Sequence, residues 1–149
     1  MRILTVGNKE YTIEFSIEAS LYKECTEKIT VLMAGIAEAQ NKADIKTLIS
    51  SMADIPQATL HMLHAGLLEH QSDWDMSKTK AVIKQYLIER KGKEDGNYYS
   101  LMELLIEDMA SDGFFEMIGL DKMFQTEEVR EPKKPQDHKK KSTEKVTEK

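Results

Sequence analysis

The sequence has little of what marks several large protein classes. It holds one cysteine, Cys25, which can form no internal disulfide and cannot by itself build a thiolate zinc site. No apolar run approaches the roughly 20 residues that a membrane span needs. The first fifteen residues alternate apolar and polar side chains and do not resemble a secretory signal. We therefore expect a cytoplasmic protein, with Cys25 as a small core residue.

Motifs for catalysis are also missing. There is no glycine-rich phosphate loop, no nucleophile elbow and no cysteine–histidine arrangement. Serine, histidine and aspartate all occur, but no spacing sets a triad apart. The sequence predicts a protein that is not an enzyme and that uses neither a cofactor nor a metal.

Positive charge is scarce in the part of the chain that can fold. The net charge is -5, and residues 126–149 carry eight basic against six acidic side chains, which leaves -7 for the preceding body. An acidic body repels phosphate backbones, so we expect no nucleic-acid partner. The alternative is a small DNA-binding regulator that would use the lysine-rich helix expected at residues 78–91.

What is present indicates a mainly α protein. Two short runs rich in β-branched and aromatic residues flank Gly7-Asn8 and predict an N-terminal β-hairpin. Behind it, apolar residues at helical spacing predict a bundle of five or six helices. The chain is long enough for one domain, which we place at residues 1–125. Residues 126–149 hold almost nothing that can be buried and are expected to be a disordered charged tail.

Helix boundaries follow from capping signals. Ser16 is expected to cap one long helix that runs to Gln40. A short helix is expected over residues 44–52, and a new one should begin at Pro56, with Asp54 as its cap. Ser77 is the expected cap of the next helix. The last long helix is expected at residues 98–111.

Two polar clusters are candidates for a metal-binding or catalytic site. His61 and His64 lie three residues apart on one predicted helix face, which leaves a metal-dependent hydrolase as a further alternative. We favour hydrogen-bonded or solvated histidines, because a third ligand falls beyond the helix. Glu103, Glu107 and Asp108 are expected to form a solvated helix face.

The densest apolar stretch, MASDGFFEMIGLDKMFQ at residues 109–125, stands at the edge of the predicted domain. Such a cluster can close the core, pair two copies of the chain or bind an apolar helix of another protein. The side chains expected to contact a partner are, in this stretch, Phe114, Phe115, Ile118, Met123 and Phe124, followed elsewhere by Met62 and Trp74.

The order of elements resembles a known family. An N-terminal hairpin of the form MRILTVGNKEYTIEF, a long helix, the segment LHMLHAGLLEHQ and a last helix ending in DGFFEMIG together resemble the tail assembly chaperones of long-tailed phages that infect Gram-positive bacteria. The resemblance covers roughly residues 1–120. No single motif carries it, and it assigns no client-binding residue.

The resemblance implies a role in tail morphogenesis. Such chaperones bind the long, helical tape measure protein, keep it soluble and help tail tube subunits assemble around it. They act in the host cell cytoplasm and are absent from the mature virion. The expected partners are thus the tape measure protein and the tail tube protein, with self-association as a further possibility and no contact with nucleic acid or membrane.

Overall fold

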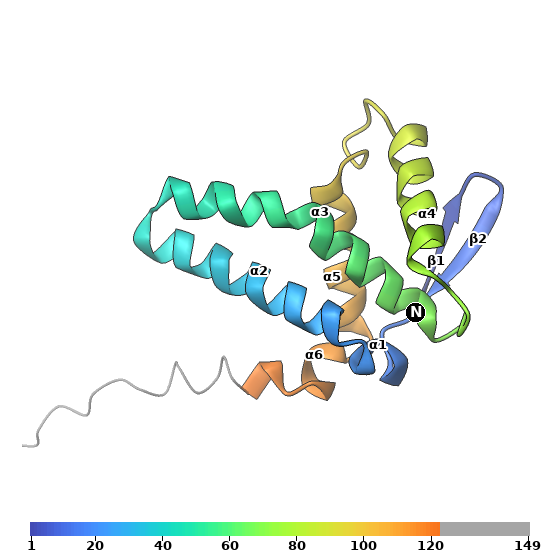
Figure 1. The fold of residues 1–149 in the computed structure, drawn as a ribbon, viewed down its shortest axis with the longest axis horizontal. Helices are drawn as coiled ribbons and strands as arrows, with labels where there is room; N and C mark the ends of the chain where they lie inside the picture. The colour runs from blue at the N-terminus through green and yellow to red at the C-terminus, as the bar shows by residue number, and fades with distance from the viewer. Residues whose placement is uncertain (123–149) are drawn as a thin grey trace, which may run out of the picture.

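The computed structural model describes residues 1–122, which form a helical body behind a two-stranded sheet (Figure 1). Strands β1 (Arg2–Val6) and β2 (Lys9–Ile13) pair antiparallel, with Leu4 opposite Tyr11. Gly7 takes a φ of 61° in the turn, a conformation that glycine adopts without strain. The predicted hairpin and the mainly helical fold class are confirmed. Met123, Phe124 and the tail predicted for residues 126–149 lie outside the described residues.

The helix expected from Ser16 to Gln40 is divided in two. Helix α1 (Ile17–Leu21) ends at Tyr22, whose backbone is extended, and α2 (Lys23–Lys42) starts directly after it. The extended residue brings the Tyr22 ring against α3, where its hydroxyl is 2.8 Å from Nδ1 of His61. The apolar spacing was correct for α2, but spacing alone does not show that a side-chain contact interrupts the helix.

Helix α3 (Ile45–Leu68) is continuous, which corrects the predicted break at Asp54 and Pro56. Asp44 caps it by accepting a hydrogen bond from the backbone N–H of Lys46. A proline inside a helix removes one backbone hydrogen bond and costs about 3 kcal/mol. That cost is offset here because apolar residues on both sides of Pro56, among them Ile55 and Leu60, are buried.

Further along the chain are α4 (Met76–Glu89), α5 (Tyr98–Ser111) and the short α6 (Phe114–Met117). Asp75, and not Ser77 as predicted, caps α4 through a 2.8 Å bond from the N–H of Lys78. Asn97 caps α5 in the same way. In α4 and α5 the cap is a side chain that accepts from a backbone N–H three residues on, which satisfies one of the donors left open at a helix start.

Helix α3 is the centre of the molecule. It contacts α1, α2, α4, α5 and β2. The core around it includes the side chains of Phe15, Ile29, Met62, Leu63, Leu105 and Phe114. Cys25 is buried in this core as predicted, and burial raises the pKa of its thiol to about 12. The α2–α3 pair extends beyond the other helices as an arm (Figure 1).

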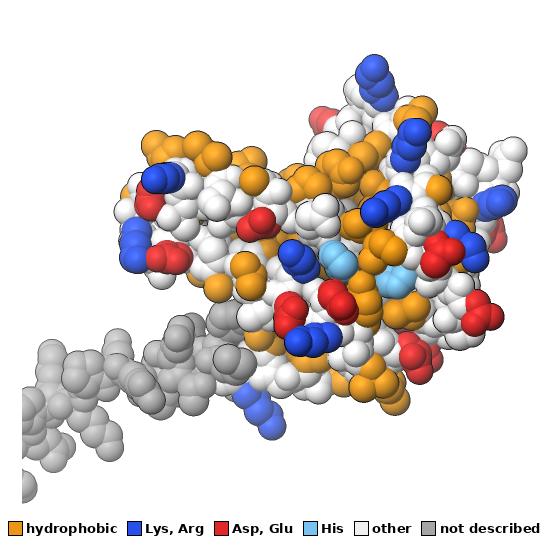
Figure 2. All heavy atoms as spheres, viewed as in Figure 1, with side chains coloured by type: hydrophobic (Ala, Val, Ile, Leu, Met, Phe, Trp, Pro, Cys, Tyr) orange, Lys and Arg blue, Asp and Glu red, His pale blue; other side chains and the backbone are white. Residues whose placement is uncertain are grey.

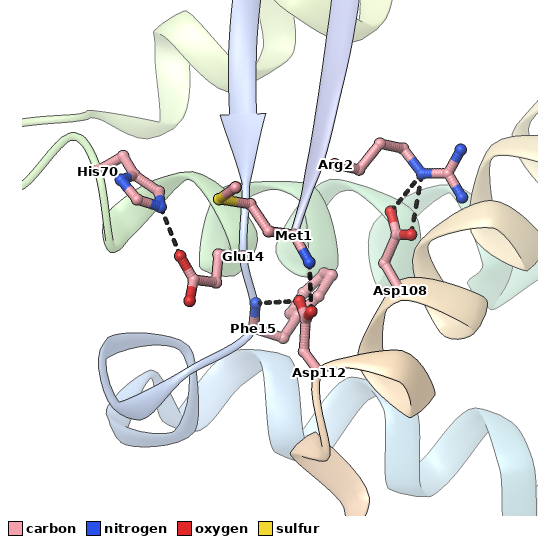
Figure 3. A network of polar contacts seen from close by, with 7 residues as sticks. All are labelled: Met1, Arg2, Glu14, Phe15, His70, Asp108 and Asp112. Carbon is pink, nitrogen blue, oxygen red and sulfur yellow. Dashed lines mark hydrogen bonds and ion pairs between the residues drawn. The ribbon is translucent and has the colours of Figure 1, made fainter.

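The hairpin is held to α5 by charged groups (Figure 3). Nε of Arg2 lies 2.7 and 2.9 Å from the two carboxylate oxygens of Asp108. Asp112 accepts from the backbone N–H of Phe15 at 2.9 Å and also pairs with the N-terminal amine. Asp108 is therefore buried, contrary to its predicted place on a solvated face. The spacing of apolar residues in α5 predicts a solvated position for Asp108, but the hairpin, which is distant in sequence, packs over it.

Candidate protein-binding surface

The outer side of the arm carries an uncovered row of large apolar side chains. They belong to residues 45–55 of α3, here called its distal half. The side chains are Ile45, Leu48, Ile49 and Met52, which are 72%, 40%, 62% and 55% exposed. Figure 2 shows hydrophobic side chains gathered along this edge of the arm. We call the four residues the distal stripe. Full burial of one such side chain contributes about 1.5–3 kcal/mol, so the monomer leaves substantial binding energy unused.

The distal stripe continues into the core. Residues 56–68 of α3, its proximal half, repeat the same helical positions: Leu63 and Leu67 follow Ile45 and Ile49 by about five whole turns and so point the same way. Leu63 and Leu67 are fully buried. The same face of one helix is thus covered at one end and open at the other.

Within the arm, α2 packs on a different face of α3. Gly35 of α2 and Ser51 of α3 approach so closely that a Cβ at Gly35 would lie 2.4 Å from the Ser51 hydroxyl oxygen. Ser51 also donates to the carbonyl of Thr47. Small residues therefore form this contact between the two helices, and the four side chains of the distal stripe stay outside it.

A groove between α3 and α4 adjoins the stripe. It has a volume of about 430 Å³ and is lined by Pro56, Gln57, Leu60, Lys80, Ile83, Lys84, Leu87, Ile88 and Tyr98. Figure 2 shows further hydrophobic side chains between α3 and α4. Among residues 1–122, neither Lys80 nor Lys84 forms an ion pair, and no carboxylate lines the groove. The site is an apolar floor with two free ammonium groups.

The described part of the aromatic cluster predicted as a contact surface, which is Phe114, Phe115 and Ile118, packs against the core. Phe114 is fully buried, with its ring centroid 5.9 Å from that of Phe15 in an edge-to-face arrangement. Met62 is fully buried as well. The expectation that Phe114 and Met62 offer contact surface is therefore wrong for the folded chain. Phe115 and Ile118 are partly buried against the core and keep some exposed surface. The structure brings none of these residues to the distal stripe.

Trp74 is partly exposed and lies between the hairpin and α4. Its Nε1 donates to the hydroxyl of Thr79 at 2.9 Å, and its ring meets that of Tyr11 edge-on at 5.8 Å. It lines a cleft of about 660 Å³ between the hairpin turn and α4. Trp74 thus joins the hairpin to α4 and lies apart from the α3–α4 groove.

The histidines are held by hydrogen bonds. Nδ1 of His64 lies 2.9 Å from the hydroxyl of Thr79, His61 bonds to Tyr22, and Nε2 of His70 lies 2.6 Å from Glu14. Burial lowers the pKa of both His61 and His64, to which Lys28 adds for His61. Over residues 1–122 no three histidine, cysteine or acidic side chains converge where a metal ion could bind. The observation that motivated a metal-dependent hydrolase therefore has another explanation.

In the basic segment considered for DNA binding, some of the cationic side chains make contacts within the protein. Arg90 stacks on the Tyr86 ring at 4.2 Å and pairs with Asp95 at 2.9 Å, while the amine of Lys78 lies over Trp74. Lys80 and Lys84 are exposed and line the groove beside apolar side chains. This arrangement does not offer a continuous row of cations to a phosphate backbone.

Sequence reasoning missed the distal stripe, although its signal was present. The i, i+3, i+4, i+7 spacing of Ile45, Leu48, Ile49 and Met52 is that of an amphipathic helix face. The expected break at Pro56 made this segment a short separate helix with nothing to connect it to the core. Recognising one continuous helix would have shown a face longer than the body could cover.

Comparisons of the chain with protein families, with curated proteins and with solved structures find no match. Within residues 1–122, no helix is both long enough and apolar enough to span a bilayer.

Proposed function

We propose that this protein is a phage tail assembly chaperone that binds the helical tape measure protein, keeps it soluble and helps tail tube subunits assemble around it. It acts by binding alone, in the host cell cytoplasm, and does not remain in the mature virion. The proposal combines the sequence resemblance with one structural observation, the uncovered distal stripe on α3.

The distal stripe supports the proposal because helices bind helices through such faces. An amphipathic helix docks by placing apolar side chains at i, i+3, i+4 and i+7 against an apolar surface. The distal stripe has this spacing and projects on an arm where a long client can reach it. Its methionine adds a flexible side chain that adapts to differing partners. A client helix covered in this way no longer exposes its apolar face to aggregation.

The net charge fits a role as a solubilising partner. The body carries about -7 and the whole chain -5. Several copies bound along one client would repel one another and keep the complex dispersed. Tail tube subunits would then displace the chaperone from the client.

Co-expression tests the proposal. The proposal predicts that a long, helix-rich tape measure protein is encoded beside this chain. That protein is produced with and without the chain, and its soluble fraction is measured. The intact chain should raise that fraction several-fold. The Ile49→Arg/Met52→Arg variant should lose most of the gain, because two buried contacts become unpaired charges. Ile17→Arg/Leu21→Arg, which changes two apolar residues on α1 that are at least as exposed, is the matched control and should retain the gain.

Two results would count against the proposal in different ways. If the long protein is equally soluble without this chain, the chaperone function is wrong. If solubility depends on the chain but Ile49→Arg/Met52→Arg performs like the intact protein, the function stands and the distal stripe is not the binding surface.

A further inference from the structure

The position of two lysines at the α3–α4 groove defines the chemistry of the occupant. We infer that the distal stripe and the groove together bind one amphipathic helix whose apolar stripe is flanked by acidic residues. This inference rests on the proposed function and specifies the class of client segment that the surface selects.

The stripe and the groove are parts of one track. Met52 ends the stripe, Pro56 follows one turn later and lines the groove, and Leu60 forms part of the groove floor. From Ile45 to Leu60 the track is about 22 Å long, which corresponds to about four turns of a docked helix. A single client helix of that length can therefore contact both parts.

The charges select among amphipathic helices. Lys80 and Lys84 stand on the α4 side of the track without an ion pair in residues 1–122, and no acidic side chain lines the groove. The body as a whole carries about -7, so the groove is a local basic site on an acidic surface. Acidic residues on the flank that faces α4 would meet two ammonium groups, whereas lysines there would meet only repulsion.

The same charges disfavour two other possible occupants of the track, which are a second copy of this chain and the chain's own residues 126–149. A second copy docked through the same track would present two groove lysines and no groove carboxylate to Lys80 and Lys84. The segment from residue 126 onward carries eight basic and six acidic side chains, so its excess charge has the wrong sign. A client with acidic flanks fits better than either.

Two designed peptides of about 18 residues test the inference. Both carry the same leucine stripe, but one has glutamates on its flanks and the other has lysines. Binding to the full-length chain is measured by fluorescence anisotropy at two salt concentrations. The acidic peptide should bind about fivefold more tightly or better, with a preference that shrinks at high salt.

Charge reversal supplies the decisive variant. Lys80→Glu/Lys84→Glu should reverse the preference between the two peptides, while Lys91→Glu/Lys93→Glu, which makes the same charge change outside the groove, should preserve it. Circular dichroism checks that both variants remain folded. The Ile49→Arg/Met52→Arg variant should bind both peptides weakly.

Several results would overturn the inference without touching the proposed function. Equal binding of both peptides, or a preference that survives Lys80→Glu/Lys84→Glu, would remove the role of charge while leaving apolar docking intact. Concentration-dependent dimers that Ile49→Arg/Met52→Arg abolishes would make a second copy the occupant. Binding to phosphatidylglycerol vesicles, lost in the charge-reversal variant and unmatched by either peptide, would make the occupant a lipid surface.

Discussion

The two halves of α3 carry the same kind of side chain on the same face but differ in what covers them. In the proximal half, Leu63 and Leu67 are buried in the core to which α4 and α5 contribute. In the distal half, Ile45 and Ile49 point in the same direction and remain exposed. Helical periodicity therefore marks a face that favours burial, but it does not identify the partner that buries it. In one half the partner is this chain, and in the other we propose that it is a client.

The largest effect is expected where the face is covered. Leu63→Ala should lower the free energy of unfolding by about 2–5 kcal/mol, because it removes buried methyl groups and leaves a cavity in the core. Ile45→Ala, the equivalent position in the distal half, should change it by less than about 0.5 kcal/mol. Urea denaturation of both variants provides the measurement. Similar losses would mean that the distal face is buried in solution and that the contrast between the halves is absent.

A pH titration sharpens the comparison, because His61 and His64 lie in the proximal half. Burial lowers the pKa of each below the 6.5 of an unfolded histidine. Well above pH 6.5 both histidines are neutral in the folded and the unfolded state, and the full stability is present. As the pH falls below 6.5, the unfolded chain takes up protons first, so stability is lost until the pH passes the folded-state values.

Denaturation midpoints measured between about pH 7.5 and pH 5 follow this loss. The His61→Gln/His64→Gln variant should show a shallower dependence, since fewer groups differ between the two states. An unchanged slope in that variant would place the pH sensitivity elsewhere. The protection factors of amide hydrogen exchange, which correct for the slower intrinsic exchange in acid, should fall with acid in the proximal half more than in the distal half, which has no histidine.

A smaller effect is expected at the contact between α2 and α3 inside the arm. Alanine is favoured over glycine within a helix by about 1 kcal/mol. At Gly35 that gain is opposed, because the new Cβ would lie 2.4 Å from the Ser51 hydroxyl oxygen. Gly35→Ala in a Ser51→Ala background should therefore stabilise the protein by about 1 kcal/mol, and Gly35→Ala alone by clearly less. Equal gains in the two backgrounds would show that Ser51 does not hold the helices at this spacing.

Much of the fold could be predicted because its signals are local. The hairpin follows from β-branched runs around Gly7, and helix α5 from its apolar spacing. Tertiary contacts decided the points that failed. Tyr22 divides the first long helix through a contact with α3, and Asp108 is buried by an arginine that lies 106 residues earlier.

The candidate site was harder to predict for the same reason. The aromatic cluster around Phe114 is conspicuous in sequence, but Phe15 and the helices accommodate its first ring. The distal stripe is shorter and less conspicuous, and its exposure depends on how far α4 and α5 reach along α3. Sequence gives the composition of an apolar face, whereas the lengths of the neighbouring elements determine which part stays open.

Helix α3 runs without a loop from the end of the arm into the packed body. Over its length it contacts α1, α2, α4, α5 and β2, and α2 runs beside it in the arm. A client helix bound to the arm would therefore be oriented relative to the body of the protein. Several copies bound along one long client would then share the same orientation.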